Sequence, residues 1–235
     1  MIRGLAQRFH QDRRRHGWQL TLRAWRMQLF RRLCGFTILQ GLKVTNIEPD
    51  NERFSGAFAA FHCSFVSSHL LESLANDPLY EIDPDFVRQA LAKGDDCFGV
   101  FEGQKLAAYS WYSSQPTLAE DGWQVQCSKK YVYMYKAFTH PAYRGRHLNG
   151  FGVSQAVRAY LGLGFKGMIC YVHPQNLASL KSLGRLGCKP FGSVAYFRGL
   201  RRVFHSSGCY DLGFAATPSR QQTRVGDREL EKVLQ

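Results

Sequence analysis

Long apolar segments, paired cysteines and acidic residues are all scarce in this chain of 235 residues. No stretch has the length and apolarity of a membrane-spanning helix, and the N-terminus lacks the apolar run of a secretory signal. The seven cysteines are scattered, without a CxxC pair or the Cys/His spacing of a zinc site. We therefore expect reduced, mostly buried cysteines, no structural metal and a cytoplasmic location.

Internal repeats and low-complexity blocks are also absent from the sequence. Apolar residues make up 45% of the chain and charged residues 21%, a composition that favours a packed core and excludes wholesale disorder. The length suits one large domain with extensions. We predict three parts: a basic arm over 1–40, the main domain over 41–216 and a polar tail over 217–235.

Basic residues are concentrated at the N-terminus. The chain holds 31 lysines and arginines against 18 acidic residues, a formal net charge of +13, and the first 33 residues contribute +8 through nine arginines and one aspartate. Apolar residues between 17 and 33 recur at helical spacing, and the arginines lie largely off that stripe; the stripe comprises Trp18, Leu22, Trp25, Leu29 and Leu33.

This pattern predicts a basic amphipathic helix, and two interpretations of it stay open. The tryptophan stripe packs on the main domain, or the arm over 1–33 binds an anionic membrane at its inner, cytoplasmic face. An acidic acyl carrier protein is a further partner that a basic surface suits, whereas nucleic acid is not favoured.

Helical patterns give way to strand patterns near residue 97. Phenylalanines at 54, 58, 61 and 65 predict a buried helix, and Asp83-Pro84-Asp85 predicts the start of another that ends at Gly94. Predicted strands cover 97–101, 106–112, 131–139, 166–173, 193–198 and 204–214, a loop covers 116–122, and helices cover 149–161 and 176–186. Because one strand–helix–strand unit must cross over, this order predicts an α/β fold with a mixed sheet.

One segment combines the features of an anion-binding site. The aromatic strand 131–139 ends at His140-Pro141, a short basic loop follows, and a helix begins near Asn149. The first turn of a helix leaves its backbone N–H groups unpaired, and the helix dipole adds positive potential there. Together with Arg144 and Arg146, these donors suit a pyrophosphate.

The segment resembles the GCN5-related N-acetyltransferase (GNAT) family, and the similarity extends over about 97–214. The family signature is an Arg/Gln-x-x-Gly-x-Gly/Ala loop after its fourth strand, often preceded by a proline and an aromatic residue. The residues that match this signature are Pro141, Tyr143, Arg144, Gly145 and Arg146. The sequence departs from the signature at His147 and Asn149, where the family has small residues.

A second motif of the family follows its fifth strand. It comprises an asparagine, a small residue three positions after that asparagine, and a Leu-Gly-aromatic sequence about ten residues after the same asparagine. The corresponding residues here are Asn176, Ser179 and Leu186-Gly187-Cys188. In the family a tyrosine seven residues after the asparagine often protonates the departing thiolate, but Leu183 occupies that position and cannot do so.

The resemblance implies a mostly antiparallel sheet with a central, splayed parallel strand pair and flanking helices, preceded here by the basic amphipathic helix. It implies acetyl-CoA or a longer acyl-CoA as donor, from which an amine or hydroxyl acceptor takes the acyl group by direct attack. The pantetheine arm would pair with the end of strand 131–139. The implied cofactor-binding residues are Ala137, Phe138, Thr139, Arg144, Gly145, Arg146, His147, Leu148, Asn149, Asn176 and Ser179.

The candidate catalytic residues are His173 and Ser182. An imidazole changes its protonation near neutral pH, so His173 could act as the base; it could equally be a hydrogen-bonding residue at a strand end. Ser182, Ser179, a tyrosine elsewhere or water could protonate the thiolate. Tyr131, Tyr133 and Tyr135 share one strand face and either line an acceptor site or pack in the core.

The sequence leaves the acceptor open between a small molecule and an envelope-linked group. A contrasting hypothesis is a non-catalytic module of the same fold that docks on anionic membrane or nucleic acid through its basic arm. Aminoacyl-tRNA as donor ranks lower, because transferases of that kind usually carry two such domains.

Overall fold

The computed structural model describes Trp18, Leu22, Arg26 and residues 36–47, 58–119, 123–197 and 202–218. Its main sheet has eight strands in the order β10-β9-β1-β8-β7-β4-β3-β2. Neighbouring strands are antiparallel except for the parallel pair β7–β8, so the predicted mixed α/β fold is confirmed. The strands are β1 (Phe36–Val44), β2 (Phe61–Phe65), β3 (Asp96–Glu102), β4 (Lys105–Ser113), β7 (Tyr131–Thr139), β8 (Gly167–Val172), β9 (Lys189–Phe197) and β10 (Arg202–His205).

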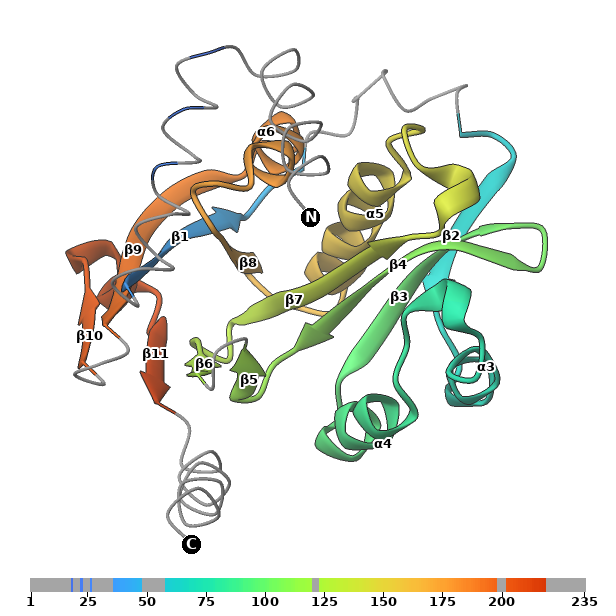
Figure 1. Ribbon diagram of the computed structural model, residues 1–235, viewed down its shortest axis with the longest axis horizontal. Coiled ribbons are helices and arrows are strands. Elements are labelled where there is room, and N and C mark those ends of the chain that lie inside the picture. The colour runs from blue at the N-terminus through green and yellow to red at the C-terminus, as the bar shows by residue number, and fades with distance from the viewer. Residues whose placement is uncertain are drawn as a thin grey trace, which may run out of the picture.

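Helices cover both faces of this sheet (Figure 1). One face packs against α5 (Leu148–Gly162) and α6 (Leu177–Arg185), and the other against α3 (Ser68–Leu74) and α4 (Pro84–Lys93). A small sheet of order β11-β6-β5 lies on the α4 side of the main sheet. The remaining elements are β5 (Thr117–Ala119), β6 (Trp123–Gln126), β11 (Ala215–Pro218), α7 (Ser207–Asp211) and the short 3-10 turns η1 (Pro78–Tyr80) and η3 (Pro141–Tyr143).

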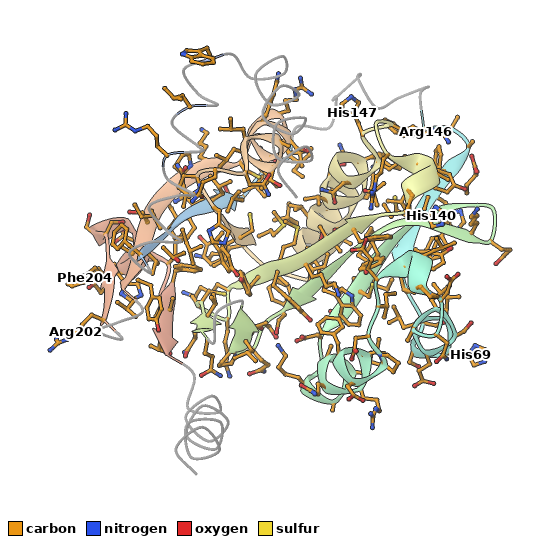
Figure 2. All side chains as sticks on the ribbon, viewed as in Figure 1. His69, His140, Arg146, His147, Arg202 and Phe204 are labelled. Carbon is orange, nitrogen blue, oxygen red and sulfur yellow. The ribbon has the colours of Figure 1, made fainter. Side chains whose placement is uncertain are left out.

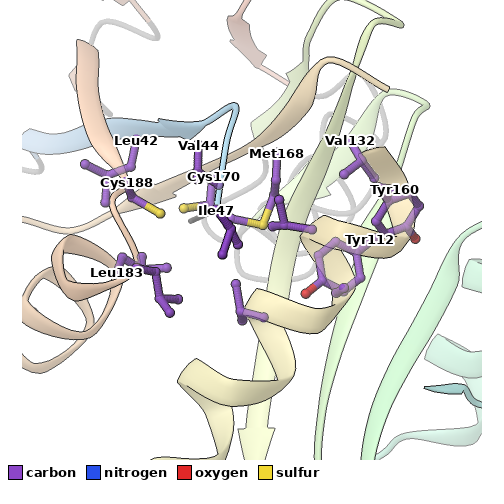
Figure 3. Close-up of a cluster of buried hydrophobic side chains, with 14 of the residues drawn as sticks. Leu42, Val44, Ile47, Tyr112, Val132, Tyr160, Met168, Cys170, Leu183 and Cys188 are labelled. Carbon is purple, nitrogen blue, oxygen red and sulfur yellow. The ribbon is translucent and has the colours of Figure 1, made fainter. Parts of the chain in front are cut away.

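The core beneath α5 fixes that helix directly on the sheet. Met168 and Val132 are almost fully buried next to Tyr160 of α5 (Figure 3). Close approach depends on Gly152, because a Cβ atom there would lie 2.6 Å from Cγ2 of Val100. The N-terminus of α5 is therefore held at a fixed place above the central strands.

Local signals predicted several elements correctly. The side chain of Asp83 accepts a hydrogen bond from the N–H of Phe86 at 2.9 Å and caps α4, which ends at Gly94 with a left-handed φ of 82°. Asn176 caps α6 in the same way by accepting from the N–H of Ser179 at 3.1 Å. The hairpin β3–β4, strand β7 and the crossover β7–α5–β8 also lie where the sequence predicts them.

Other predictions were wrong. Residues 61–65 form strand β2 rather than part of a helix, because the whole segment pairs in register with β3, from Phe61↔Glu102 to Phe65↔Phe98; Phe54 lies outside the described residues. The predicted loop 116–122 contains β5, and the predicted strand 204–214 is divided into the end of β10, helix α7 and a turn. Residues 217 and 218 of the predicted tail belong to β11, and the rest of it lies outside the described residues.

Strand β1 was not predicted, although it lies in the middle of the main sheet. It pairs with β8 on one side and with β9 on the other, and the boundary proposed at residue 40 falls within it. Of the predicted helix 17–33, the structure describes Trp18, Leu22 and Arg26, and all three are helical. No helix within the described ranges combines the length and the apolarity that a membrane span requires.

Candidate functional site

The parallel strands β7 and β8 separate partway along their length. Residues Tyr131–Tyr133 pair with Gly167–Ile169. Immediately beyond, the adjacent residues Trp111 and Tyr112 of β4 pair with Lys136 and Met134, so that Tyr135 is an extra residue on β7. Such a bulge bends a strand and increases its twist. The bulge accounts for the divergence of β7 from β8, which leaves both strand edges open (Figure 1).

A cleft of about 320 Å³ occupies this opening. It brings together six of the predicted catalytic and cofactor-binding residues: Ala137, Asn149, His173, Asn176, Ser179 and Ser182. The other lining residues are Tyr133, Met134, Tyr135, Lys136, Tyr171, Val172 and Leu183. Residues from β7, β8, α5 and α6 thus converge on one site.

The other seven predicted site residues lie outside the cleft lining: Phe138, Thr139, Arg144, Gly145, Arg146, His147 and Leu148. Phe138 is buried and stacks on Tyr109, with a centroid separation of 5.2 Å, on the α4 side of the sheet. Leu148 is only 1% exposed and packs in the core beneath α5. The carbonyl of Thr139 accepts a hydrogen bond from Nε of Arg144 at 3.2 Å. Phe138 and Leu148 can therefore contact a ligand through their backbone only.

The loop between η3 and α5 presents a row of backbone donors. Gly145 has a φ of 85° and His147 a φ of 60°, so both residues are left-handed. His147 precedes α5 and makes no side-chain cap. The N–H groups of Gly145 and of residues 147–150 find no acceptor within the described chain. This arrangement can bind a pyrophosphate through amide hydrogens and the positive end of the α5 dipole.

The same loop carries Arg144 and Arg146, and Figure 2 shows Arg146 near His147. Arg144 pairs with Oε1 of Glu81 at 3.6 Å, and Arg146 pairs with Oε1 of Glu102 at 3.9 Å. The Arg146 guanidinium also lies 5.0 Å from the centroid of the Phe61 ring. Because both side chains are about half exposed and exposed ion pairs are weak, each guanidinium can exchange its carboxylate for a phosphate.

Polar groups of α5 and α6 meet inside the cleft. A Cβ atom at Gly150 would lie 3.6 Å from Oγ of Ser182, so the two helices come close there. Oδ1 of Asn149 is buried and accepts no hydrogen bond from the described residues. An unsatisfied buried acceptor costs about 1–3 kcal/mol, and a ligand N–H or O–H group in the cleft would satisfy it.

The opposite wall of the cleft is aromatic. The Tyr135 hydroxyl donates to Oδ2 of Asp95 at 2.7 Å, and Asp95 also pairs with Lys93 at 2.9 Å. Burial, reinforced by the hydrogen bond to Asp95, raises the pKa of Tyr135 above its usual value. Burial is likewise the main reason why the pKa of Tyr133 is raised. Both hydroxyls stay protonated at neutral pH, and the Tyr135 proton is already donated to Asp95.

His173 lies directly after β8, where the cleft is open. Its carbonyl accepts a hydrogen bond from the N–H of Asn176 at 2.8 Å, which ties the residue to the start of α6. Its ring meets the Tyr171 ring edge to face at a centroid distance of 6.3 Å. Among the described residues that line the cleft, it contributes the one imidazole, so it is a group that can accept a proton there.

Sequence reasoning missed Lys136, Tyr171 and the bulge at Tyr135. Tyr171 and His173 lie two residues apart at the end of one strand, and this period-two spacing could have placed both on one face. The bulge depends on pairing with β4 and has no local signal. Among the described residues, no cluster of three His, Cys, Asp or Glu side chains could hold a metal ion.

A comparison with protein-family models assigns the chain to one family. The family model described as "Acetyltransferase (GNAT) family" matches residues 63–188, just over half of the chain. No curated protein sequence gives a significant match. Among solved structures, a GCN5-related N-acetyltransferase-like protein from Streptococcus suis is 15% identical with a TM-score of 0.45, and the alignment covers 72% of this chain and 65% of that one.

Two further structures are similar at the same level. A GNAT family acetyltransferase from Colwellia psychrerythraea is 12% identical with a TM-score of 0.47, covering 72% of this chain and 56% of that one. The yncA protein from Salmonella typhimurium, solved with its cofactor acetyl-CoA, is 16% identical with a TM-score of 0.41, covering 57% and 80%. The chain thus spans less than two thirds of the first two of these structures.

Proposed function

The chain belongs to the GNAT acetyltransferase family, and from this premise we propose that it transfers an acyl group from acyl-CoA to an amine or hydroxyl acceptor in the cleft between β7 and β8. The observation that carries the proposal is the row of amide donors at the start of α5, which adjoins a cleft that ends at His173. A diphosphate-linked thioester fits both features.

Donor binding would use the α5 and α6 side of the cleft. The N–H groups of Gly145 and residues 147–150 would bind the pyrophosphate, with Arg144 and Arg146 beside them. The open edge of β7 near Ala137 would pair with the pantetheine arm as an added strand does. The buried Oδ1 of Asn149 would accept a hydrogen bond from the acyl-CoA, and this bond would favour acyl-CoA binding.

The transfer itself requires a base and an acid. The acceptor nitrogen, or oxygen, attacks the thioester carbonyl carbon, the C–S bond breaks, and CoA leaves as a thiolate that takes up a proton. His173 would accept the proton of the attacking group. Because Leu183 cannot donate, Ser182 or water would supply the proton to sulfur; burial raises the pKa of Tyr133 and Tyr135, which makes both phenols poor acids.

Calorimetry with CoA and acetyl-CoA tests this function directly. We expect both to bind the full-length protein with dissociation constants in about the micromolar range that is common for enzyme substrates. We also expect a CoA species to be detected by mass spectrometry of the purified protein. Absence of binding at high micromolar CoA would contradict acyltransferase function, because no other described feature supplies a donor site.

We further propose that the N-terminal arm docks on anionic membrane. Trp18 and Leu22 are 54% and 38% exposed, and Arg26 is exposed as well. Their i, i+4, i+8 spacing puts all three on one helical face, in a segment of net charge +8. The exposure favours docking over packing on the main domain, and we propose that the membrane face is the inner, cytoplasmic one. An acidic acyl carrier protein is the other partner that this charge suits.

Vesicle co-sedimentation tests the docking. We expect the double variant Trp18→Ser, Leu22→Ser to bind vesicles rich in phosphatidylserine at least about thirtyfold more weakly, because each apolar side chain contributes roughly 1–2 kcal/mol on burial. Leu163→Ser removes a leucine that is 64% exposed at the end of α5 and is the matched control. Equal binding to neutral phosphatidylcholine vesicles, or no loss in the double variant, argues against docking.

A further inference from the structure

The acceptor side of the cleft is a wall of stacked aromatic rings. Tyr133 lies nearly parallel to Tyr171, with centroids 6.0 Å apart at 24°, and nearly parallel to Tyr135, at 6.1 Å and 27°. These rings lie on the face of the sheet opposite α5 and α6. If acyl-CoA occupies the helix side, as proposed above, the aromatic wall faces the acceptor.

The charge of this wall comes from a single lysine. Of the described residues that line the cleft, none is an aspartate or glutamate, and Lys136 carries the one permanent charge. Asp95 lies behind Tyr135, 1% exposed, and is paired with Lys93. A cationic acceptor such as a polyamine would therefore meet an ammonium group and no carboxylate in the lining, which is unfavourable by Coulomb's law.

The Lys136 ammonium has a defined position at the edge of the wall. It donates to the carbonyl oxygen of Glu81 at 3.1 Å and lies 4.4 Å from the centroid of the Phe86 ring. An ammonium group has three N–H donors, so donors remain beyond the one that Glu81 accepts. Partial burial lowers the pKa of Lys136, although the charges of Glu81 and Asp83 oppose this effect; a bound anion would offset the same desolvation.

We propose that the acceptor of this transferase is an amine that carries an anionic group, a carboxylate or a phosphate, which binds the Lys136 ammonium while the body of the molecule lies against the tyrosine wall. The inference rests on the proposed acyl transfer. Lys136 selects the acceptor through charge, and the neighbouring rings supply apolar contact to a ring or a flat carbon skeleton.

Matched pairs of acceptors test the proposal in a thiol-release assay with acetyl-CoA. The carboxylate pair is phenylalanine and phenylalaninamide, and the phosphate pair is glucosamine 6-phosphate and glucosamine. We expect the anionic member of at least one pair to be used preferentially, and the two pairs separate carboxylate from phosphate. In Lys136→Met, KM for that member should rise about tenfold at little change in kcat, since a hydrogen bond to a charged group contributes about 1.5–3 kcal/mol.

Two further variants separate charge from shape. Lys136→Arg keeps the cation and should retain the preference. Lys105→Met is the matched control, because this lysine also lies near an aromatic ring, 5.6 Å from the Tyr143 centroid, but outside the cleft lining. It should leave KM unchanged for both members of the acceptor pair. Calorimetry with CoA on each variant reports whether the donor site has folded.

The outcomes distinguish this inference from the proposed function. If the unaltered protein does not bind CoA, the proposed acyl transfer itself is overturned. If CoA binds, the inference is overturned by equal use of both members of each pair, by faster turnover of spermidine, by no turnover of any of the four acceptors, or by a Lys136→Met variant that keeps the preference.

Discussion

The variant His173→Gln is expected to lose about two to three orders of magnitude in kcat, which is the usual contribution of a general base. An attacking amine must lose a proton, and His173 contributes the one imidazole among the described residues that line the cleft. Glutamine has a similar size and can still form a hydrogen bond, but it cannot accept a proton. Affinity for acetyl-CoA, measured by calorimetry, should stay unchanged because His173 lies at the acceptor end of the cleft.

The pH profile distinguishes a base from a structural residue. A base works in its neutral form, so kcat of the unaltered protein should fall under acidic conditions that protonate the base, and the variant should lack this acid limb of the pH profile. His69→Gln, which alters an exposed histidine on α3 (Figure 2), is the matched control. If kcat of His173→Gln stays within about threefold of the unaltered protein, the base is another group or water.

The sequence predicted those parts of the site whose signals are local. Loop 140–149 combines a strand end, a proline, glycine and arginines immediately before a helix, and all of these features are contiguous. Asn176 was assigned as a helix cap for the same reason, and its side chain does accept from the N–H of Ser179. Both Asn149 of this loop and Asn176 line the cleft.

Features that depend on distant pairing could not be predicted in this way. Strand β1 is inserted between β8 and β9, about 120 to 160 residues away along the chain, and long-range pairing leaves no periodic signal of its own. The phenylalanines at 58, 61 and 65 fit a helical spacing, but Phe58 lies in a turn, and pairing with β3 makes a strand of residues 61–65. The bulge at Tyr135 and the position of Lys136 follow from register with β4 and from contact with α4.

The variant Gly145→Val tests whether the loop amides bind the donor. Gly145 has a φ of 85°, and a Cβ atom there would meet nothing within 4 Å, so the substitution adds backbone strain without a clash. A β-branched residue strongly disfavours that conformation, and we expect the loop to relax and turn its N–H groups away from the diphosphate. Loss of even one charge-assisted hydrogen bond of about 1.5–3 kcal/mol weakens CoA binding about tenfold to a hundredfold.

Gly164→Val separates loss of the donor site from loss of stability. Gly164 has a φ of 90° and equally open surroundings, but it follows the opposite end of α5, which at 1.5 Å per residue is about 22 Å long. Both valine variants should lower the unfolding temperature similarly, whereas only Gly145→Val should weaken CoA binding in calorimetry. His147→Gly, which relaxes the second left-handed residue of the loop, should bind CoA at least as tightly as the unaltered protein. If Gly145→Val and Gly164→Val bind CoA with equal affinity, the diphosphate is held elsewhere, because the strain is matched and only the location differs.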